Sequence, residues 1–260
     1  MMMTKENKAK LAVDSLMDSC KMLAELSKGM EHKEGYDAYF VPETFWYNRV
    51  HLHPDTSSDI KETIQEVSSR VRAGELPPLL SWNEDDFDKK EMRRLLLDAG
   101  YVPMVTQTLM HISLQGRTPS QNAPQVEKIR QEEVEVWSQM TAEAFGKPAE
   151  TEGMKLLSTH KDCDFLTWQE SDGDNASGKM LGGTLLICKD KNAGIHEVST
   201  LPEHRRKGIG AALVNRAFDM AVEKGCAYAT LQASELGFYL YSQLGMEEVG
   251  YLQNWIMPRE

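Results

Sequence analysis

The 260-residue sequence predicts an α/β (α+β) fold built from two mixed-sheet domains in tandem. Three observations support this prediction. Strand-like and helix-like patterns alternate along the chain, a linker-like stretch interrupts them near the middle, and the two halves end in similar segments. The length also suits two small domains, at roughly 100–200 residues per domain. We therefore expect domains at residues 1–115 and 125–260, joined by a linker at 116–124.

The interruption is Gln115–Pro124, whose letters QGRTPSQNAP are rich in Gly, Pro, Ser and Asn and lack apolar periodicity. Before it, apolar spacing and capping residues predict helices and extended segments in alternation. The expected elements are a helix near Lys10–Met30, strands Tyr39–Val41 and Phe45–Leu52, a helix from Asp59 to about Glu75, a charged helix Asp88–Ala99 and an extended run Tyr101–Leu114.

The second half repeats this alternation and ends in the same way as the first. Leu95–Ile112 can be laid over Tyr239–Met257 with Gly100 on Gly245, because both segments read as helix, C-cap glycine and long strand. The expected elements are a helix Val134–Phe145, strands Phe165–Gln169 and Met180–Lys189 joined by a polar hairpin Glu170–Lys179, a strand Gly194–Thr200, a helix Gly208–Lys224, a strand Ala227–Ala233, a short helix Leu236–Leu244 and a strand Met246–Met257.

Composition and charge exclude several function classes. Lys plus Arg number 29 against 40 Asp plus Glu, a net charge of −11, which disfavours a nucleic-acid binder. Four scattered cysteines form no C-x-x-C pair, so neither a zinc site nor a disulfide framework is expected. The chain shows no uninterrupted apolar stretch of signal-peptide or membrane-span length. We expect a cytoplasmic protein that binds no nucleic acid and no membrane, either a monomer or a homodimer.

The most informative segment is Glu197–Ala221, in which a strand leads through Pro202 and a basic cluster to two glycines and a helix. Gly208 and Gly210 let the backbone approach a ligand closely, and the helix start offers free N–H groups. A dinucleotide fingerprint requires a third small residue where Leu213 stands, and an NTPase phosphate loop requires different spacing. The pattern therefore predicts a pyrophosphate-binding loop of another kind.

This loop, RRKGIGA at residues 205–211, resembles the Q/R-x-x-G-x-G/A signature of the GNAT N-acetyltransferase superfamily. SELGFYLYSQLGM, at 234–246, is similar to its second signature, N-x-x-A-x-x-x-Y-x-x-x-G-F, with Ser234 for Asn, Gly237 for Ala and Met246 for Phe. The resemblance covers residues 125–260. The first half resembles a degenerate copy, in which Arg70–Trp82, where the loop is expected, has no G-x-G.

The resemblance implies acetyl-coenzyme A as co-substrate, with its pantetheine paired to a strand and its pyrophosphate on the loop. The implied cofactor-binding residues are Val198, Ser199, Thr200, Arg205, Arg206, Lys207, Gly208, Ile209, Gly210, Ala211 and Ser234. Tyr241 is in the position where the family places its general acid, which protonates the leaving thiolate. His196 and Glu197 are both candidate general bases for the acceptor amine, and the sequence does not choose between them.

The leading functional prediction is an acetyl-coenzyme A-dependent N-acetyltransferase that acetylates a small-molecule amine by direct attack. The alternatives are acetylation of protein N-termini or lysines, and a coenzyme A-binding regulator without turnover. No metal is expected: His51 and His53 share a face of a predicted strand, but no third ligand is evident and Pro54 follows.

Overall fold

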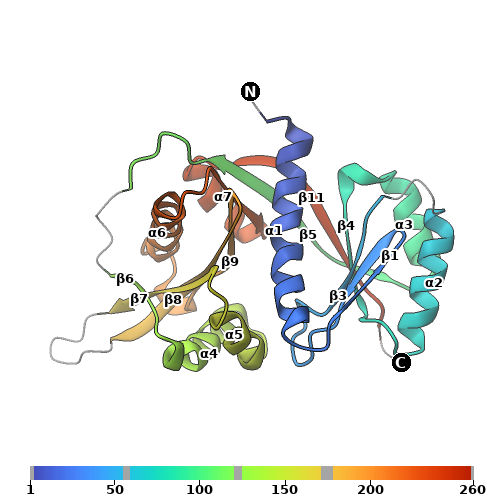
Figure 1. The fold of residues 1–260 in the computed structure, drawn as a ribbon, viewed down its shortest axis with the longest axis horizontal. Coiled ribbons are helices and arrows are strands. Elements are labelled where there is room, and N and C mark those ends of the chain that lie inside the picture. The colour runs from blue at the N-terminus through green and yellow to red at the C-terminus, as the bar shows by residue number, and fades with distance from the viewer. Residues whose placement is uncertain (1–2, 55–58, 120–124, 171–177, 259–260) are drawn as a thin grey trace. The chain divides into compact units, whose positions relative to one another are not determined.

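The structure is a computed structural model that describes residues 3–54, 59–119, 125–170 and 178–258. It has the expected α/β fold class (Figure 1). Contacts divide the chain into two units, which are described separately. The first comprises Met1–Leu109, Gln232–Glu235 and Glu248–Glu260, and the second comprises Met110–Leu231 and Leu236–Glu247. This division differs from the predicted boundaries, because the last strand of the second half belongs by its contacts to the first unit.

The first unit contains a mixed sheet in the strand order β1-β2-β3-β4-β11-β5. β3 and β4 are parallel and β11 is antiparallel to β4, with Trp255 opposite Leu80. The final strand therefore completes this sheet. The elements are α1 (Lys5–Glu25), β1 (Met30–Lys33), β2 (Tyr36–Tyr39), β3 (Arg49–Leu52), α2 (Ile60–Arg72), β4 (Leu79–Asn83), α3 (Lys89–Asp98), β5 (Val102–Ser113, of which Val102–Leu109 lie in this unit) and β11 (Glu247–Ile256).

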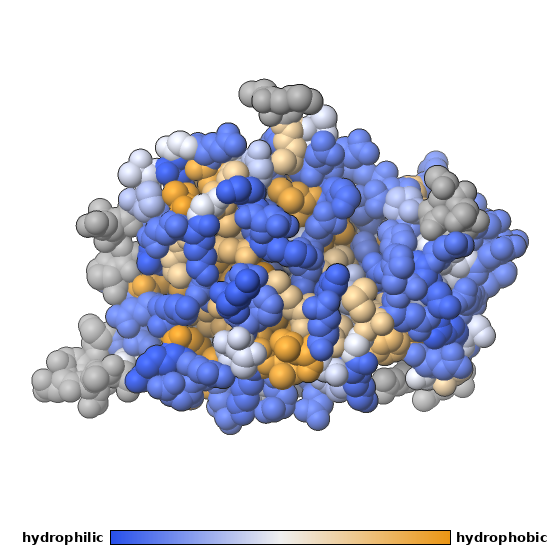
Figure 2. All heavy atoms as spheres, viewed as in Figure 1, coloured by the Kyte–Doolittle hydropathy of each residue, from blue (hydrophilic) through white to orange (hydrophobic). Residues whose placement is uncertain are grey.

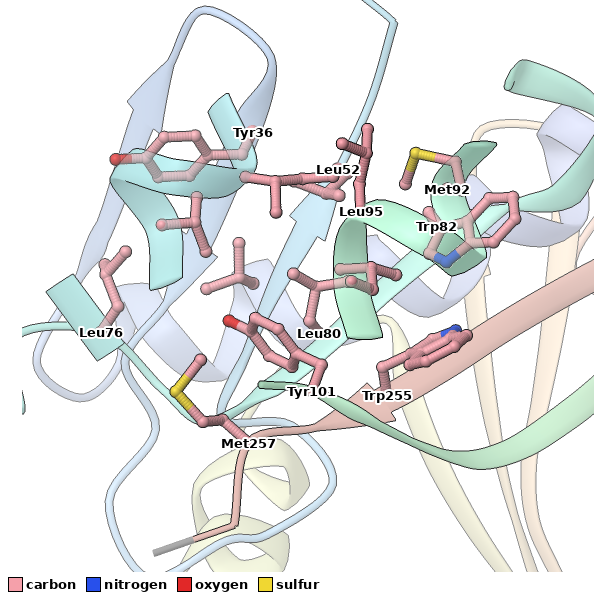
Figure 3. Packing of buried hydrophobic residues seen from close by; sticks show 14 of the residues in the cluster. Tyr36, Leu52, Leu76, Leu80, Trp82, Met92, Leu95, Tyr101, Trp255 and Met257 are labelled. Atoms are coloured by element: carbon pink, nitrogen blue, oxygen red, sulfur yellow. The ribbon is translucent and has the colours of Figure 1, made fainter. Parts of the chain in front are cut away.

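One face of this sheet packs against α2 and α3. Ile64 and Val67 of α2 and Leu95 of α3 join strand residues in a buried cluster. Figure 3 shows Trp82 of β4, Met92 of α3 and Trp255 of β11 gathered in that cluster. Because β11 supplies Trp255 next to the β4 side chains, the core of the first unit depends on residues from the far end of the sequence.

The second unit contains the sheet β10-β9-β8-β7-β6. Gly182 and Gly183 are neighbours on β8 and point to opposite faces, since a Cβ at Gly182 would meet Ile209 of α6 and one at Gly183 would meet Trp137 of α4. Thus α4 and α6 cover opposite faces. The elements are β6 (Val126–Lys128), α4 (Val134–Phe145), α5 (Thr151–Ser158), β7 (Cys163–Glu170), β8 (Lys179–Lys189), β9 (Asn192–Thr200), α6 (Ile209–Glu223), β10 (Tyr228–Ala233) and α7 (Glu235–Gln243).

The main errors of sequence reasoning are local. The strand predicted at Phe45–Leu52 begins only at Arg49, because the Trp46 carbonyl turns inward to accept hydrogen bonds from the Arg49 guanidinium, Nε at 2.8 Å and an Nη at 2.6 Å. α5, β1, β4 and β6 were not predicted. Residues 120–124 of the expected linker and 171–177 of the expected hairpin lie outside the described residues.

Figure 2 shows hydrophilic side chains over much of the visible face, with smaller apolar patches between them. None of the four cysteines forms a disulfide bond. Within the ranges that the structure describes, no helix combines the length and apolarity needed to cross a membrane.

Candidate active site

The basic loop predicted from the sequence leads from β9 to the first turn of α6. Two of its residues have left-handed backbone conformations, Arg206 with φ 64° and Gly208 with φ 85°. Gly208 is the N-cap of α6 and provides no side-chain cap. The N–H groups of Ile209, Gly210 and Ala211 therefore have no helical acceptor, and no other acceptor among the described residues. Open amide donors and the positive end of a helix dipole form an anion site.

The three cations of the loop have different roles. The Arg205 guanidinium donates to the Ala144 carbonyl at 2.7 Å and the Thr200 carbonyl at 3.3 Å, so it ties the loop to α4 and to the end of β9. Arg206 and Lys207 are exposed and have no hydrogen bond or ion pair with any residue that the structure describes. Arg205 thus shapes the loop, whereas Arg206 and Lys207 can face an anion.

The two glycines are required for different reasons. A Cβ at Gly208 would meet nothing within 4 Å, so only its positive φ favours glycine there. A Cβ at Gly210 would lie 3.1 Å from Leu240 Cδ2 of α7. Gly210 therefore lets α7 pack closely against the first turn of α6. The G-x-G pattern combines a conformational requirement with a steric one.

On one backbone edge, the last residues of the strand before the loop have no strand partner in the described part of the chain. β9 and β10 run parallel and pair at Asn192–Tyr228, Ala193–Ala229 and Gly194–Thr230, where their described ladder ends. On its other edge, β9 stays paired with β8 as far as Thr200. Val198, Ser199 and Thr200 therefore lie beyond the β9–β10 ladder. An extended amide ligand can add to a sheet edge of this kind by backbone hydrogen bonds.

Glu197 lies at a bulge in β9. The β8–β9 register shifts between Gly183 and Leu185, and Glu197 takes a left-handed φ of 52°. Its carboxylate accepts a hydrogen bond from Lys147 Nζ at 3.3 Å, and only 8% of its side chain is exposed. The bulge thus directs a buried carboxylate toward the segment that connects α4 and α5.

A second carboxylate reaches the same ammonium. Glu150 Oε2 lies 3.7 Å from Lys147 Nζ, and its side chain is 7% exposed. Burial opposes the charged form of Lys147, but Glu197 and Glu150 outweigh that effect and raise its pKa above the usual value. A cavity of about 10 Å³, room for one water, is lined by Trp137, Ser138, Thr141, Ala142, Lys147, Glu150, Met154 and Glu197. This pocket holds a primary ammonium between two buried carboxylates.

His196, the other candidate base, has a different environment. Its ring is buried, its Nε2 has no hydrogen-bond partner within the described ranges, and burial lowers its pKa to about 4. A neutral and enclosed imidazole is poorly placed to accept a proton from a substrate amine. The geometry favours Glu197 over His196 as the group beside an acceptor.

Tyr241, on α7, is buried, with 8% of its surface exposed, and burial raises the pKa of its phenol. Gly237, where the GNAT signature has Ala, explains how the ring fits. A Cβ at Gly237 would lie 2.8 Å from Tyr241 Cε2 and 3.4 Å from its hydroxyl oxygen. In this structure the Tyr241 ring therefore lies directly against the backbone of Gly237.

Ser234 and the segment Arg70–Trp82 were also singled out from the sequence. Ser234 is exposed and lies between β10 and α7, in a segment whose contacts assign it to the first unit. The segment Arg70–Trp82 was wrongly taken as the counterpart of the cofactor loop. It contains the end of α2, a turn and all but the last residue of β4, whereas the strand-to-helix connection that corresponds to the loop lies between Leu52 and Ile60. Residues 55–58 of that connection are outside the described ranges.

Sequence reasoning missed Lys147 and Glu150. Lys147 and Glu197 are 50 residues apart, and no local pattern links them. The one available signal was the GKPAE segment after a predicted helix, in which a lysine and a glutamate three residues apart flank a proline.

Part of the chain is similar to known acetyltransferases. Residues 130–246 match the model of the acetyltransferase (GNAT) family. An uncharacterised N-acetyltransferase of Methanocaldococcus jannaschii is 30% identical over 90 residues, which are 31% of this chain and 40% of that protein. A thialysine N-epsilon-acetyltransferase of Bos taurus is 27% identical over 70 residues, 26% of this chain and 41% of that protein. The matches therefore span about two fifths of the curated relatives.

A solved structure, titled a GCN5-related N-acetyltransferase from Kribbella flavida, is similar over nearly the whole chain. It has a TM-score of 0.68 at 15% identity and covers 95% of this chain and 96% of its own. At that identity the likeness concerns the fold. With the family model, the loop signature and this fold in agreement, residues 130–246 belong to the acetyltransferase (GNAT) family.

Proposed function

We propose that the protein is an acetyl-coenzyme A-dependent N-acetyltransferase that acetylates a small cationic amine. The observation that carries the proposal is the open first turn of α6, where Gly208 supplies no cap and three backbone N–H groups have no acceptor among the described residues. Such a turn binds phosphate oxygens by charge-assisted hydrogen bonds. Arg206 and Lys207 add positive charge, and the edge of β9 at Val198–Thr200 can pair with the pantetheine amides.

The acceptor proposal depends on the pocket around Lys147. Glu150 and Glu197 are buried carboxylates that already hold one primary ammonium. A substrate ammonium has the same charge and the same donors, so it can replace the Lys147 headgroup when that side chain swings out. The pocket therefore favours cationic alkylamines over anionic or neutral acceptors.

The proton transfers follow from these positions. The amine must lose a proton to attack the thioester carbonyl, and Glu197 is the proposed acceptor of that proton, directly or through one water. Collapse of the tetrahedral intermediate releases a thiolate, which Tyr241 is proposed to protonate. A phenol is a weaker acid than a thiol, and burial of Tyr241 increases that difference. Donation must therefore coincide with C–S bond cleavage.

We further propose that the first unit is a degenerate GNAT-like domain without a cofactor loop. Its order of strand β3, helix α2, parallel strand β4 and helix α3 parallels β9, α6, β10 and α7. The whole-chain likeness to the Kribbella flavida structure supports the same interpretation.

The decisive experiment measures release of coenzyme A thiol with acetyl-coenzyme A and a panel of alkyl diamines, amino acids and peptides. We expect turnover with cationic amines, and a fall of about 10²-fold in kcat/KM for Glu197→Gln. Glu152→Gln, at an exposed glutamate of α5, is the matched control and should be silent. Exclusive turnover of peptides would favour a protein acetyltransferase, and binding of coenzyme A without turnover would favour a regulator.

A further inference from the structure

Three side chains of the first unit converge at the edge of its sheet, and the proposed acetyl transfer does not use them. His32 on β1 and Asp37 on β2 are direct cross-strand partners, and the His32 Nδ1–Asp37 Oδ1 distance is 2.6 Å. His53 follows β3, with its N–H bonded to the Gly35 carbonyl at 3.1 Å. This backbone bond fixes His53 beside the β1–β2 hairpin.

The two imidazoles face each other closely. The rings of His32 and His53 are stacked, with centroids 5.8 Å apart and planes inclined by 13°. His53 Nε2 is buried and lacks a hydrogen-bond partner within the described part of the chain. One ligand atom each of His32, Asp37 and His53 lies within 4.8 Å of the other two. A buried ring nitrogen without a partner is costly unless a ligand completes it.

The surroundings attract cations. A surface hollow of about 720 Å³ includes His32 in its lining, together with one lysine and four acidic residues: Lys33, Glu34, Asp59, Glu62 and Glu66. Carboxylates concentrated around a recess lower the electrostatic potential there and raise the local concentration of cations. The two observations are independent: the charge of the hollow favours a cation, and the neutral imidazole of His53 can offer the lone pair of its orphaned nitrogen to one.

We propose that His32, Asp37 and His53 bind a divalent transition metal ion, with Zn²⁺ the best match. Two imidazoles and one carboxylate, with water at the fourth position, form a common tetrahedral zinc ligand set. Zinc–ligand bonds of about 2.0–2.2 Å place tetrahedral ligand atoms about 3.3 Å apart, so the three side chains need only small movements. His32 can make them easily, since 72% of its side chain is exposed.

The metal would cross-link the β1–β2 hairpin to the end of β3. These strands are joined otherwise by backbone pairing, and β1 is the edge of the sheet. Because imidazole ligands must be neutral to coordinate, metal affinity should fall as the pH is lowered. The site lies wholly within the first unit, so the proposal stands independently of acetyl transfer.

The test is a calorimetric titration of the metal-free full-length chain with ZnCl₂, supported by the visible absorption of bound Co²⁺. We expect one equivalent of Zn²⁺ per chain and a tetrahedral Co²⁺ spectrum. His53→Gln and His32→Gln should each weaken Zn²⁺ binding by at least about 100-fold. Asp37→Asn should weaken it as well, because it removes the charged oxygen ligand.

His160→Gln is the matched control. His160 Nδ1 and Asp162 Oδ2 are 3.9 Å apart in the second unit, a His–Asp pair that belongs to no three-ligand group among the described residues, so Zn²⁺ binding should be unchanged. If the wild-type chain binds no stoichiometric Zn²⁺, or if His32→Gln and His53→Gln bind it as tightly as wild type, the proposal is wrong. His32 is exposed, so its variant remains informative if His53→Gln fails to fold.

Discussion

The two units each contain a strand that leads into a helix, and the two helix starts are opposite in chemistry. In the first unit, Asp59 caps α2: its carboxylate accepts the Lys61 N–H at 2.8 Å, and Glu62 adds negative charge to the first turn. In the second unit, Gly208 leaves the first turn of α6 without a cap and without an acidic residue. One helix start has a carboxylate that accepts one of its N–H donors, and the other leaves its donors open.

This difference shows that position in the fold does not by itself make an anion site. Every helix start has free donors and a positive dipole, but a capping carboxylate takes up one of these donors and places a negative charge beside the rest. The helices that follow, α3 in the first unit and α7 in the second, also differ in the side chain at one aligned position. With Gly100 aligned to Gly245, Leu96 of α3 stands where α7 has Tyr241, and both side chains are buried. The first unit thus has neither the open helix start nor the phenol.

Removing the phenol should produce the largest effect. Tyr241→Phe keeps the ring that packs over Gly237 and loses only the proposed proton donor, so kcat should fall by about 10²–10⁴-fold while coenzyme A affinity changes little. Steady-state kinetics and calorimetry measure the two quantities. Tyr239→Phe is the control, because Tyr239 is 70% exposed. Unchanged turnover with weakened affinity would make Tyr241 a binding residue.

Closing the open helix start should come next. Gly208→Asp places a carboxylate at the start of α6, where its negative charge competes with the phosphates for the open N–H groups, so we expect coenzyme A affinity to fall by about 10²-fold, the value of one or two charge-assisted hydrogen bonds. Gly225→Asp is a close control: Gly225 follows α6, has φ 82° against 85° at Gly208, and neither glycine has a neighbour within 4 Å of an added Cβ.

Calorimetry of the same variants counts the sites. The wild-type chain should bind one coenzyme A, and Gly208→Asp should show no second site, since α2 is already capped. If the wild-type chain bound two equivalents and Gly208→Asp weakened only one of them, the first unit would contain a coenzyme A site, and the two helix starts would not differ in the way described.

Removing the cap of α2 should have a smaller effect, on stability alone. Asp59→Ala leaves the Lys61 N–H without its acceptor and should lower the free energy of unfolding by about 1 kcal/mol. Urea denaturation measures this value, and exposed Asp98 at the end of α3 provides a control substitution. If the Asp59→Ala variant bound a second coenzyme A, the Asp59 cap alone would be what prevents coenzyme A from binding to the first unit.

The smallest expected effect concerns acid stability of the first unit. Hydrogen bonds from Arg70, at 2.7 and 2.9 Å, outweigh burial and lower the pKa of Glu31. Stability from this pair is present above the ordinary glutamate value of about 4.3 and is lost as the pH falls through the lowered one. Glu31→Gln should therefore cost less than about 1 kcal/mol at pH 7 and less still at pH 2. An equal loss at both pH values would exclude an ionic contribution.

Sequence reasoning succeeded where consecutive residues carry the signal. The loop at 205–211 contains its cations, its glycines and the helix start in one run, and α6 begins at Ile209, one residue after the predicted start. Asp59 was likewise recognised as a cap. The strand β4 was missed because Pro77 and Pro78 suggested a loop, although both precede the first strand residue, Leu79.

The parts of the fold and of the candidate sites that sequence reasoning missed depend on contacts between residues far apart in the sequence. Nothing in the sequence near Glu197 indicates Lys147, which reaches it from the end of α4. His53 was considered together with His51 as a possible pair of metal ligands, but the side chains near His53 are His32 and Asp37, which come from two other strands. His51 bonds to Ser81 instead, and burial lowers its pKa to about 3. Sequence reasoning also could not predict that β11 pairs with β4, because each half of the chain ends in a similar strand.

That pairing has a consequence for synthesis on the ribosome. Leu79–Asn83 of β4 leave the exit tunnel long before Leu252–Ile256 of β11, and at 5–20 residues per second the interval is on the order of ten seconds. During this time one edge of β4 lacks its partner, and Leu80 and Trp82 lack the packing of Trp255. The nascent first unit therefore cannot complete its sheet until β11 has emerged, and one edge of β4 stays exposed until then.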